Sequence, residues 1–343
     1  MPRLAGLATA VPDHVITQAE AREGARRVFA ARPALFERMA PIYETAGIDT
    51  RRSAVPLDWY FAPHDWHDRS TVFLDTALDL LEDAARRCLD EAGIGAGQVD
   101  AIVTICSTGI ATPGLDARLM ERLPFRPDTV RLPVFGLGCA GGVLGLARAA
   151  ALSRALNGTV LLLVVELCGP TFRRSDLTKS NVVATALFGD GAAAVLIRPE
   201  DGVPALGPTG EHRWPGTLDV MGWSVETDGL GVIFSRDIPT LVRNDMRPAA
   251  EGFLARHGLG LADLSGFVFH PGGTKVVEAL RDAFDLPDAA MTAERAVLRR
   301  YGNMSAVTVL FVLAEKRRQM AGRWLLSALG PGFCAGFTVL DCG

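Results

Sequence analysis

The chain has 343 residues, of which 49% are hydrophobic and 22% are charged, and its formal net charge at pH 7 is -4. This composition is typical of a globular protein with a large core, and the charge balance gives no reason to expect nucleic acid as a partner. No apolar run approaches the ~18 residues that span a bilayer, and the N-terminus lacks the apolar segment of a signal peptide. We therefore expect a cytoplasmic protein without an integral membrane segment.

Cysteine usage agrees with that location. Six cysteines are scattered along the chain without a Cys-x-x-Cys pair, at positions 88, 106, 139, 168, 334 and 342. Such spacing argues against a zinc site and against a disulfide framework, and thiols that stay reduced fit the cytoplasm. We expect neither a metal nor a bound cofactor.

The N-terminal region combines a strand, a polar helical segment and three neighbouring arginines. The strand is expected at residues 4–11 and the helical segment from about Thr17 to Met39. The arginines are Arg38, Arg51 and Arg52. Two interpretations stay open for them: a solvated basic face, or a contact for the phosphates of coenzyme A, because guanidinium groups pair with phosphate in a bidentate fashion.

Apolar strands alternate with helices through the rest of the first half. The expected elements are helices at 71–91 and 116–123 and strands at 101–105, 130–135, 159–166 and 192–197. The first apolar strand breaks into small polar residues, as expected of a buried parallel strand whose end opens onto a site. The segment 199–216 is rich in Pro and Gly and is the best candidate for a boundary. We therefore expect an N-terminal domain at 1–205 and a C-terminal domain at 206–343.

Cys139 is enclosed by glycines in the segment 136–142, between a strand and an apolar, Ala- and Leu-rich helix. A sharp strand-to-helix turn leaves backbone N–H groups unpaired, and the positive end of the helix dipole favours a thiolate. This pattern indicates a cysteine nucleophile. The alternative is a buried cysteine that only fills space in the core.

The second half repeats the order of elements of the first. Its expected elements are a strand at 266–269, a helix at 274–284, a helix starting near 303 and strands at 324–329 and 335–340. Two half-folds related by a pseudo-twofold place equivalent helix starts and strand ends toward a shared centre. We therefore expect Cys139, His270 and Asn303 to converge.

These three residue types suit one kind of chemistry. Taken alone, His270 at a strand end is either a core residue or a catalytic group, and Asn303 is an ordinary helix cap. Together with Cys139 they provide a nucleophile, a base and a neutral amide donor. His and Asn can both donate to the oxygen that becomes negative when a malonyl thioester loses carbon dioxide.

At these residues the chain resembles the type III polyketide synthases, relatives of chalcone synthase within the thiolase fold. The resemblance covers nearly the whole chain and is carried by the Gly-Cys-Ala-Gly-Gly around Cys139, residues 186–191, 270–273 and 302–305, and the loop Gly330-Pro331-Gly332. It implies an α/β, thiolase-like fold of two pseudo-twofold halves layered α-β-α-β-α, with that loop as a scaffold for the site.

The resemblance also implies the reaction. Cys139 is acylated by a starter acyl-CoA, and His270 with Asn303 assists the decarboxylation of malonyl-CoA. The resulting enolate extends the chain over several rounds before cyclisation, and no carrier protein is needed. Members of the family are homodimers, and Thr112 matches the residue that reaches into the partner's cavity. The alternative for Thr112 is a loop residue beside Pro113.

Residues around the expected cavity point to the substrate. Phe188 matches one of two gate phenylalanines, or is a core aromatic, and Val232 stands where the second is expected, which widens the passage. Thr171 and Cys168 are candidate lining residues, although a buried cysteine is the simpler interpretation of the latter. Segments 166–168 and 221–223 resemble bacterial members that make alkylresorcinols or alkylpyrones. We therefore expect a medium- or long-chain acyl starter and a resorcinol or pyrone product.

Three alternatives stay open at this point. A single-round 3-ketoacyl synthase of the fatty-acid-initiating type also uses Cys, His and Asn, but it usually has Gln-Ala-Asn after its histidine, where this chain has 271–273 as Pro-Gly-Gly. A degradative thiolase needs a second active-site cysteine, and neither Cys334 nor Cys342 has the expected glycine context. A non-catalytic acyl-binding protein of the same fold is the third alternative.

Overall fold

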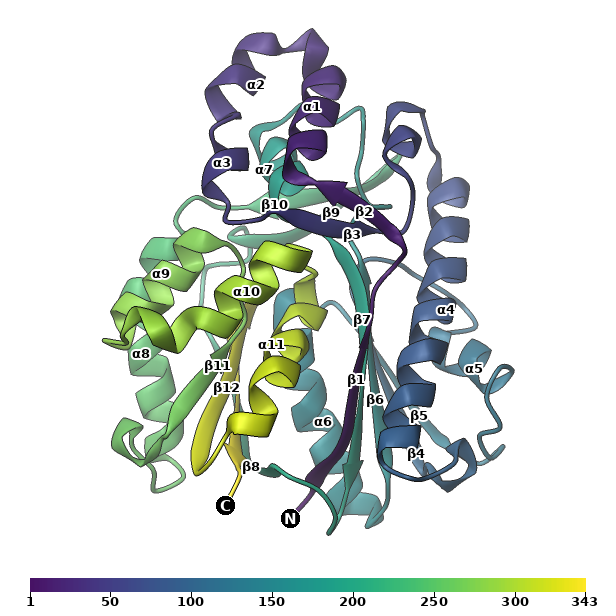
Figure 1. The fold of residues 1–343 in the computed structure, drawn as a ribbon, viewed down its shortest axis with the longest axis vertical. Helices are drawn as coiled ribbons and strands as arrows, with labels where there is room; N and C mark the ends of the chain where they lie inside the picture. The colour runs from purple at the N-terminus through teal and green to yellow at the C-terminus, as the bar shows by residue number, and fades with distance from the viewer.

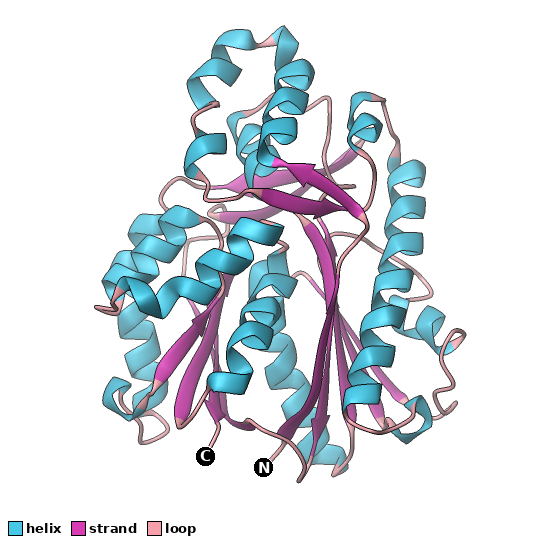
Figure 2. Cartoon of the chain, viewed as in Figure 1, coloured by secondary structure: helices cyan, strands magenta, loops and turns pink.

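The computed structural model describes residues 1–343 and centres on a nine-stranded sheet. The strands follow the order β11-β12-β13-β8-β1-β7-β6-β4-β5 (Figures 1 and 2). Their bounds are β1 Arg3–Ala10, β4 Ala101–Cys106, β5 Val130–Phe135, β6 Val160–Leu167, β7 Asp190–Arg198, β8 Ala205–Arg213, β11 Gly266–Phe269, β12 Arg323–Gly330 and β13 Cys334–Asp341.

The nine strands form two groups with the same internal order. In the first group β4 is parallel to β6, which is antiparallel to β7, which is antiparallel to β1; β5 adds a parallel edge beside β4. In the second group β11 is parallel to β12, which is antiparallel to β13, which is antiparallel to β8. The groups meet where Arg3 of β1 pairs with Ala205 of β8. This repetition confirms the expected duplication and the α/β class.

The segment 199–216, the expected boundary, connects the last strand of the first group, β7, to the first strand of the second group, β8. Strand β8 occupies half of it and pairs with β13 along its length. The glycines of β8 are tolerated because neighbouring side chains pack over them, as Phe253 does over Gly210. The division into domains at 205/206 stays a prediction.

Helices complete five layers, α-β-α-β-α. Helix α4 (Trp66–Glu91), with α5 (Leu115–Met120), covers the outer face of the first group of strands. Helices α6 (Gly141–Leu156) and α11 (Thr308–Lys316) lie side by side between the two groups (Figure 1). Helices α8 (Ile238–Ala255) and α9 (Thr274–Ala283) cover the outer face of the second group.

This layering explains why the central strands read as continuous apolar runs. In β6, Val160 and Leu162 face the core around α6 and α11, whereas Leu161 and Leu163 face the core beneath α4. Both faces of the strand are dry, so every position except Glu166 is apolar.

Helix α6 also corrects one expectation from composition. Together with the turn before it, the helical stretch Gly138–Leu156 is long and apolar enough to cross a membrane by length and composition alone. In the structure it is the central helix of the fold and packs against strands of both groups. Its apolar character is therefore that of a core helix.

The remaining elements form a cap over the ends of the strands (Figure 1). The expected helix from Thr17 to Met39 is broken into α1 and α2, because Pro33 has no N–H to continue the first helix and starts the second. The cap elements are β2 His14–Thr17, α1 Gln18–Val28, α2 Pro33–Met39, α3 Ile42–Thr45, β3 Thr50–Ser53, α7 Lys179–Leu187, β9 Met221–Glu226 and β10 Gly229–Phe234, with α10 Thr292–Tyr301 below them.

Candidate active site

Cys139 lies in the short 3-10 turn Gly138–Ala140 between β5 and α6. Gly138 has φ +46°, in the left-handed region that glycine adopts without strain. A Cβ at this position would also collide with the ring of Pro331. The loop Gly330-Pro331-Gly332 at the end of β12 therefore packs directly against the turn that presents the cysteine.

Burial dominates the titration of the Cys139 thiol. It raises the pKa to about 12, and the charge of Glu166 acts in the same direction, while hydrogen bonds from the side chains of Ser305 and Asn303 oppose it. Burial of the thiol therefore opposes the thiolate that the helix start favours, because burial takes the charge out of water. The nucleophile rests as a thiol.

Ser305 is a site residue that the sequence analysis missed. The Cys139 S–H donates to Ser305 Oγ at 3.6 Å. Ser305 has φ +49°, which is uncommon for a residue other than glycine, and its N–H donates to Asn303 Oδ1 at 2.9 Å. Strain of this kind often accompanies function. The signal in the sequence is its place two residues after Asn303.

Asn303 is held by main-chain contacts on both sides. Its N–H donates to the carbonyl of Leu187 at 2.8 Å, and its own carbonyl accepts from the N–H of Gly189 at 3.0 Å. Its side-chain amide donates from Nδ2 to the carbonyl of Gly272 at 3.1 Å. Phe188, between the two residues that bind the Asn303 backbone, thus forms an isolated backbone bridge with Asn303.

His270 follows β11 directly and is buried. Its N–H donates to the carbonyl of Ser327 in β12 at 3.0 Å, but neither ring nitrogen has a hydrogen-bond partner. Burial lowers the pKa of His270 to about 3, so the imidazole is neutral at rest. The ring lies against Gly272, the residue whose carbonyl holds Asn303.

The structure therefore brings Cys139, Asn303 and His270 into one buried cluster, linked through Ser305 and Gly272. The thiol contacts Ser305 and the Asn303 amide, and the amide in turn is tied to the Gly272 segment beside the imidazole. The thiol can attack an acyl carbonyl in this cluster. The unpartnered imidazole nitrogens and the amide N–H lie in the same cluster, where they can stabilise the negative charge that develops on the carbonyl oxygen.

Glu166 is a second residue beside the cluster that the sequence analysis did not single out for the site, and its charge raises the pKa of Cys139. It lies near the end of the apolar strand β6, is fully buried, and accepts hydrogen bonds from the N–H of Ser107 (3.0 Å) and from Thr108 Oγ1 (2.8 Å). Its other oxygen has no partner. Burial raises its pKa to about 8. The available signal was an acidic residue inside an otherwise apolar strand, since a buried carboxyl needs a reason.

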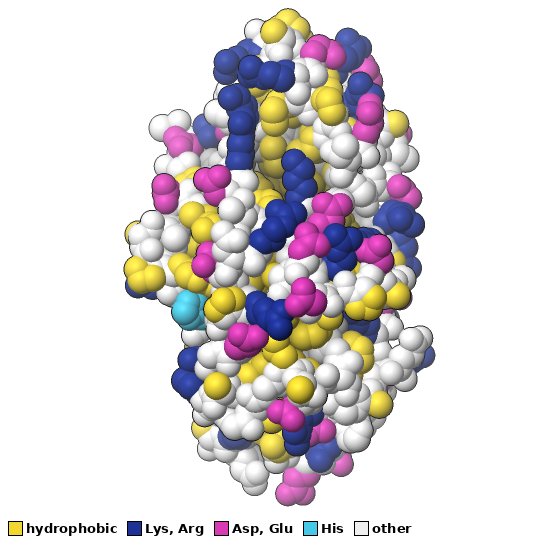
Figure 3. Space-filling model, turned by 90° about the vertical axis from the view of Figure 1, so that its left-hand side faces the viewer, with side chains coloured by type: hydrophobic (Ala, Val, Ile, Leu, Met, Phe, Trp, Pro, Cys, Tyr) yellow, Lys and Arg dark blue, Asp and Glu magenta, His cyan; other side chains and the backbone are white.

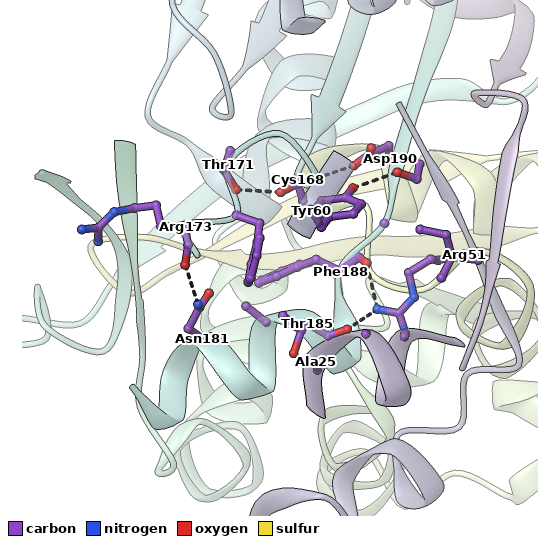
Figure 4. Close-up of a pocket in the computed structure, with 18 of the residues that line it drawn as sticks. Ala25, Arg51, Tyr60, Cys168, Thr171, Arg173, Asn181, Thr185, Phe188 and Asp190 are labelled. Atoms are coloured by element: carbon purple, nitrogen blue, oxygen red, sulfur yellow. Dashed lines mark hydrogen bonds between the residues drawn. The ribbon is translucent and has the colours of Figure 1, made fainter. Parts of the chain in front are cut away.

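A cavity lies beside this cluster, under the cap. Its empty volume is about 840 Å³, including the part open to solvent, and Cys168, Thr171, Phe188 and Val232 all line it. Figure 4 shows Phe188 among these side chains, with Cys168 and Tyr60 on one side of it and Thr185 on the other. Cys168 is also close enough to Cys139 for a charge on that sulfur to raise its pKa. Cys139, His270 and Asn303 do not themselves line the cavity; it approaches their cluster through Cys168 and through Phe188, whose backbone bridges to Asn303.

Family models of chalcone and stilbene synthases match almost the whole chain, the N-terminal domain over residues 3–201 and the C-terminal domain over residues 210–339. The solved structure of 1,3,6,8-tetrahydroxynaphthalene synthase from Streptomyces coelicolor A3(2), a bacterial type III polyketide synthase, is similar, with a TM-score of 0.94, 27% identity and 99% of each chain covered. The chain belongs to the type III polyketide synthases.

Sequence relatives of the synthase agree with this assignment. A 1,3,6,8-tetrahydroxynaphthalene synthase of Streptomyces peucetius is 39% identical, with 98% of this chain and 92% of the relative covered. An alpha-pyrone synthesis polyketide synthase-like protein of Mycobacterium tuberculosis is 30% identical, with 95% of this chain and 88% of the relative covered. The synthase is therefore an acyltransferase with a thiolase-like fold.

The three arginines of the synthase occupy different environments. Arg51 is buried, and its guanidinium donates to the carbonyls of Thr185 (2.6 Å) and Ala186 (3.0 Å) at the end of α7. Protein carbonyls thus occupy its two Nη atoms, and it is not part of a solvated surface, although its side chain lines the cavity and its Nε has no hydrogen-bond partner. Arg52 is half-buried and lines the cavity, and Arg38 is exposed on α2.

Thr112 lies apart from the catalytic cluster within its own chain. It is exposed in the loop after β4, next to Pro113, and does not line the cavity beside Phe188. This placement leaves its side chain accessible to another molecule, and its expected role toward a partner subunit stays a prediction.

Proposed function

We propose that the synthase loads a medium- or long-chain acyl group from acyl-CoA onto Cys139, extends it with malonyl-CoA over several rounds and cyclises the product to a resorcinol or pyrone. The observation that carries this proposal is the cavity beside the catalytic cluster. More than half of its 26 lining residues are hydrophobic, and an acyl chain is favoured there by about 0.8 kcal/mol for each buried CH₂ group.

Loading begins with a neutral thiol and a neutral imidazole. As the sulfur of Cys139 bonds to the starter carbonyl, its proton passes to His270, and coenzyme A leaves as the thiol after receiving that proton. Because both groups rest uncharged in a dry site, charge develops only in the transition state, where the Asn303 amide is in place to stabilise it.

Extension uses the same donors. When the malonyl thioester loses carbon dioxide, the carbonyl oxygen becomes an enolate oxygen and accepts hydrogen bonds from the His270 ring and from Asn303 Nδ2. The enolate carbon then bonds to the acyl carbonyl and Cys139 leaves as a thiolate, ready to take the chain back from coenzyme A. No proton needs to come from solvent in the bond-forming step.

Two features of the cavity favour an alkyl starter. Val232, on β10, has a smaller side chain than the phenylalanine expected at a gate, and Trp223 on the paired strand β9 extends the apolar wall. The relative from Mycobacterium tuberculosis, named for alpha-pyrone synthesis, supports a pyrone product.

A second candidate deserves a direct comparison. The relative that is 39% identical makes 1,3,6,8-tetrahydroxynaphthalene, an aromatic product without an alkyl chain. Under this alternative malonyl-CoA supplies the starter as well as the extender, and the apolar cavity accommodates the growing polyketide.

We further propose that coenzyme A enters beside the cap. Arg38 on α2 and Arg52 on the cavity wall are candidates for the phosphate contacts, whereas Arg51 is not. Figure 3 shows Lys and Arg side chains in the upper part of one face, beside a hollow with a hydrophobic floor. That combination suits a phosphate-bearing thioester whose pantetheine arm leads inward.

Strand β5 supports the expected homodimer. It is an edge strand, and its apolar side chains Val130, Leu132 and Phe135 are 43%, 36% and 54% exposed. An exposed apolar edge is normally covered. We propose that a second copy of the chain covers it and meets Thr112 nearby, in a cytoplasmic homodimer.

Mass spectrometry of the products tests the proposal. The purified synthase is incubated with malonyl-CoA alone and with acyl-CoA starters from acetyl to palmitoyl, and Cys139→Ala serves as the control. Alkylated products that carry two or more decarboxylated malonyl units, absent in the variant, support the fatty acyl proposal. Tetrahydroxynaphthalene from malonyl-CoA alone supports the second candidate. A single extension, or acyl-CoA binding without an acyl adduct, contradicts both.

A further inference from the structure

Strand β11, which leads to His270, has a sheet neighbour on one side only. It is the last strand of the sheet and pairs with β12. On its free edge two side chains replace a second strand: Glu294 Oε1 accepts the N–H of Phe269 at 3.1 Å, and Lys316 Nζ donates to the carbonyl of Phe267 at 2.9 Å. The unpaired edge groups are thus satisfied by an acid and a base.

Glu294 and Lys316 also form an ion pair with each other. Their Oε1 and Nζ atoms are 2.6 Å apart, and the side chains are 0% and 13% exposed. Lys316 donates in addition to the carbonyl of Ala290 at 3.2 Å. A pair this deeply buried is costly to form and weak as a source of net stability, so its retention points to a requirement for geometry.

The pair joins the three elements that carry the catalytic cluster. Phe269 directly precedes His270. Glu294 belongs to α10, which ends two residues before Asn303, and Lys316 ends α11, the helix that begins soon after Ser305. One ion pair therefore ties the supports of His270, Asn303 and Ser305 together.

His270 needs such support because nothing holds its ring by hydrogen bonds. Its orientation depends on the backbone of β11 and on packing. We propose that Glu294 and Lys316 are positioning residues, which take the place of a missing strand and fix the imidazole relative to the Asn303 amide for decarboxylation. This inference rests on the proposed roles of His270 and Asn303.

The chain offers a matched control. Arg317, the next residue after Lys316, forms a similar pair with Glu91 at 2.6 Å, and the two bracket Leu7 of β1: Glu91 Oε2 accepts the Leu7 N–H at 3.0 Å and Arg317 donates to its carbonyl at 3.2 Å. This pair also binds the backbone N–H and carbonyl groups of a strand, but β1 carries no catalytic residue.

Two partial reactions separate positioning from general stability. One is the acylation of Cys139 by acyl-CoA, which is measured as the increase in mass of the intact protein. The other is the conversion of malonyl-CoA to acetyl-CoA. In Glu294→Gln and Lys316→Met we expect decarboxylation to fall about tenfold or more, because small displacements of a catalytic group are costly. Acylation, in which His270 only takes the proton of Cys139, should fall by less. Lys316→Arg, which keeps the charge and donors, should retain most of the decarboxylation.

Glu91→Gln should leave both rates unchanged in the folded protein. The inference is overturned if either folded variant, Glu294→Gln or Lys316→Met, decarboxylates at the wild-type rate, if both reactions fall equally, or if Glu91→Gln loses decarboxylation to the same extent. If neither variant folds, the pair is a stability element and the inference fails. His270→Gln, measured alongside, tests the proposed function separately, since its retention of decarboxylation contradicts that role whatever the pair does.

Discussion

Glu166 makes the stability of the synthase depend on pH in a direction that can be worked out from its environment. In the unfolded chain its carboxyl releases a proton near its ordinary pKa of 4.5, whereas in the fold burial raises that pKa to about 8. Between these values the folded protein binds the extra proton. The contribution of Glu166 to stability is therefore fully present below about pH 4.5 and is lost as the pH rises toward about 8.

The magnitude follows from the same two values. Each pKa unit corresponds to about 1.4 kcal/mol, so the contribution is expected to fall by about 3 kcal/mol between about pH 5.5 and about pH 8.5. Glu166→Gln removes the titration while keeping an oxygen that accepts from Ser107 and Thr108. The free energy of unfolding of the wild type should therefore decrease relative to that of the variant as the pH rises.

Urea unfolding at matched protein concentration and a series of pH values measures this difference, since all groups common to both proteins cancel. Glu211→Gln, at an exposed position of β8, controls for the loss of one carboxylate. Parallel stability curves for the wild type and Glu166→Gln would refute the reasoning. The variant should also react faster with iodoacetamide at Cys139 above about pH 8, because the charge of Glu166 raises the pKa of that thiol.

Three further predictions concern the turn, the cavity and the arginines. Gly138→Ala forces a side chain into the left-handed region and against Pro331. It should lower the free energy of unfolding by about 1–3 kcal/mol and slow Cys139 acylation, measured by protein mass. Gly97→Ala, at an open position with no positive φ, should do neither. Val232→Phe should lower the yield of products from palmitoyl-CoA about tenfold with acetyl-CoA little affected, as product masses will show; equal losses for both starters would contradict a role in chain accommodation. Arg38→Gln should raise the KM for malonyl-CoA at unchanged melting temperature. Arg51→Gln, which leaves buried carbonyls unpaired, should instead lower the melting temperature. A lower melting temperature for Arg38→Gln and a raised KM alone for Arg51→Gln would reverse their assigned roles.

Local pattern was sufficient for the elements whose surroundings are uniform. Strand β6 is buried on both faces and helix α6 is mostly buried up to Ala150, so their apolar runs predict them directly. The glycines around Cys139 predict a turn. The positive φ of Gly138 and its close contact with Pro331 exclude a side chain at that position. The repeated order of elements predicts the two-half architecture. The same local rules missed strand β8, because its pairing with β13 outweighs the low strand propensity of its proline and glycines.

Charge states and long-range contacts were decided only in three dimensions. By itself the sequence determined that a cysteine, a histidine and an asparagine stand at turns and strand ends of a duplicated fold. Tertiary structure decided that the thiol and the imidazole rest neutral, because burial depends on what packs around them. It also decided that Arg51 is a buried support of α7, and that Glu294 and Lys316 meet at the edge of β11. The physical reason is that desolvation and hydrogen bonding depend on neighbours that are distant along the chain, whereas periodicity and turn chemistry depend on neighbours that are near.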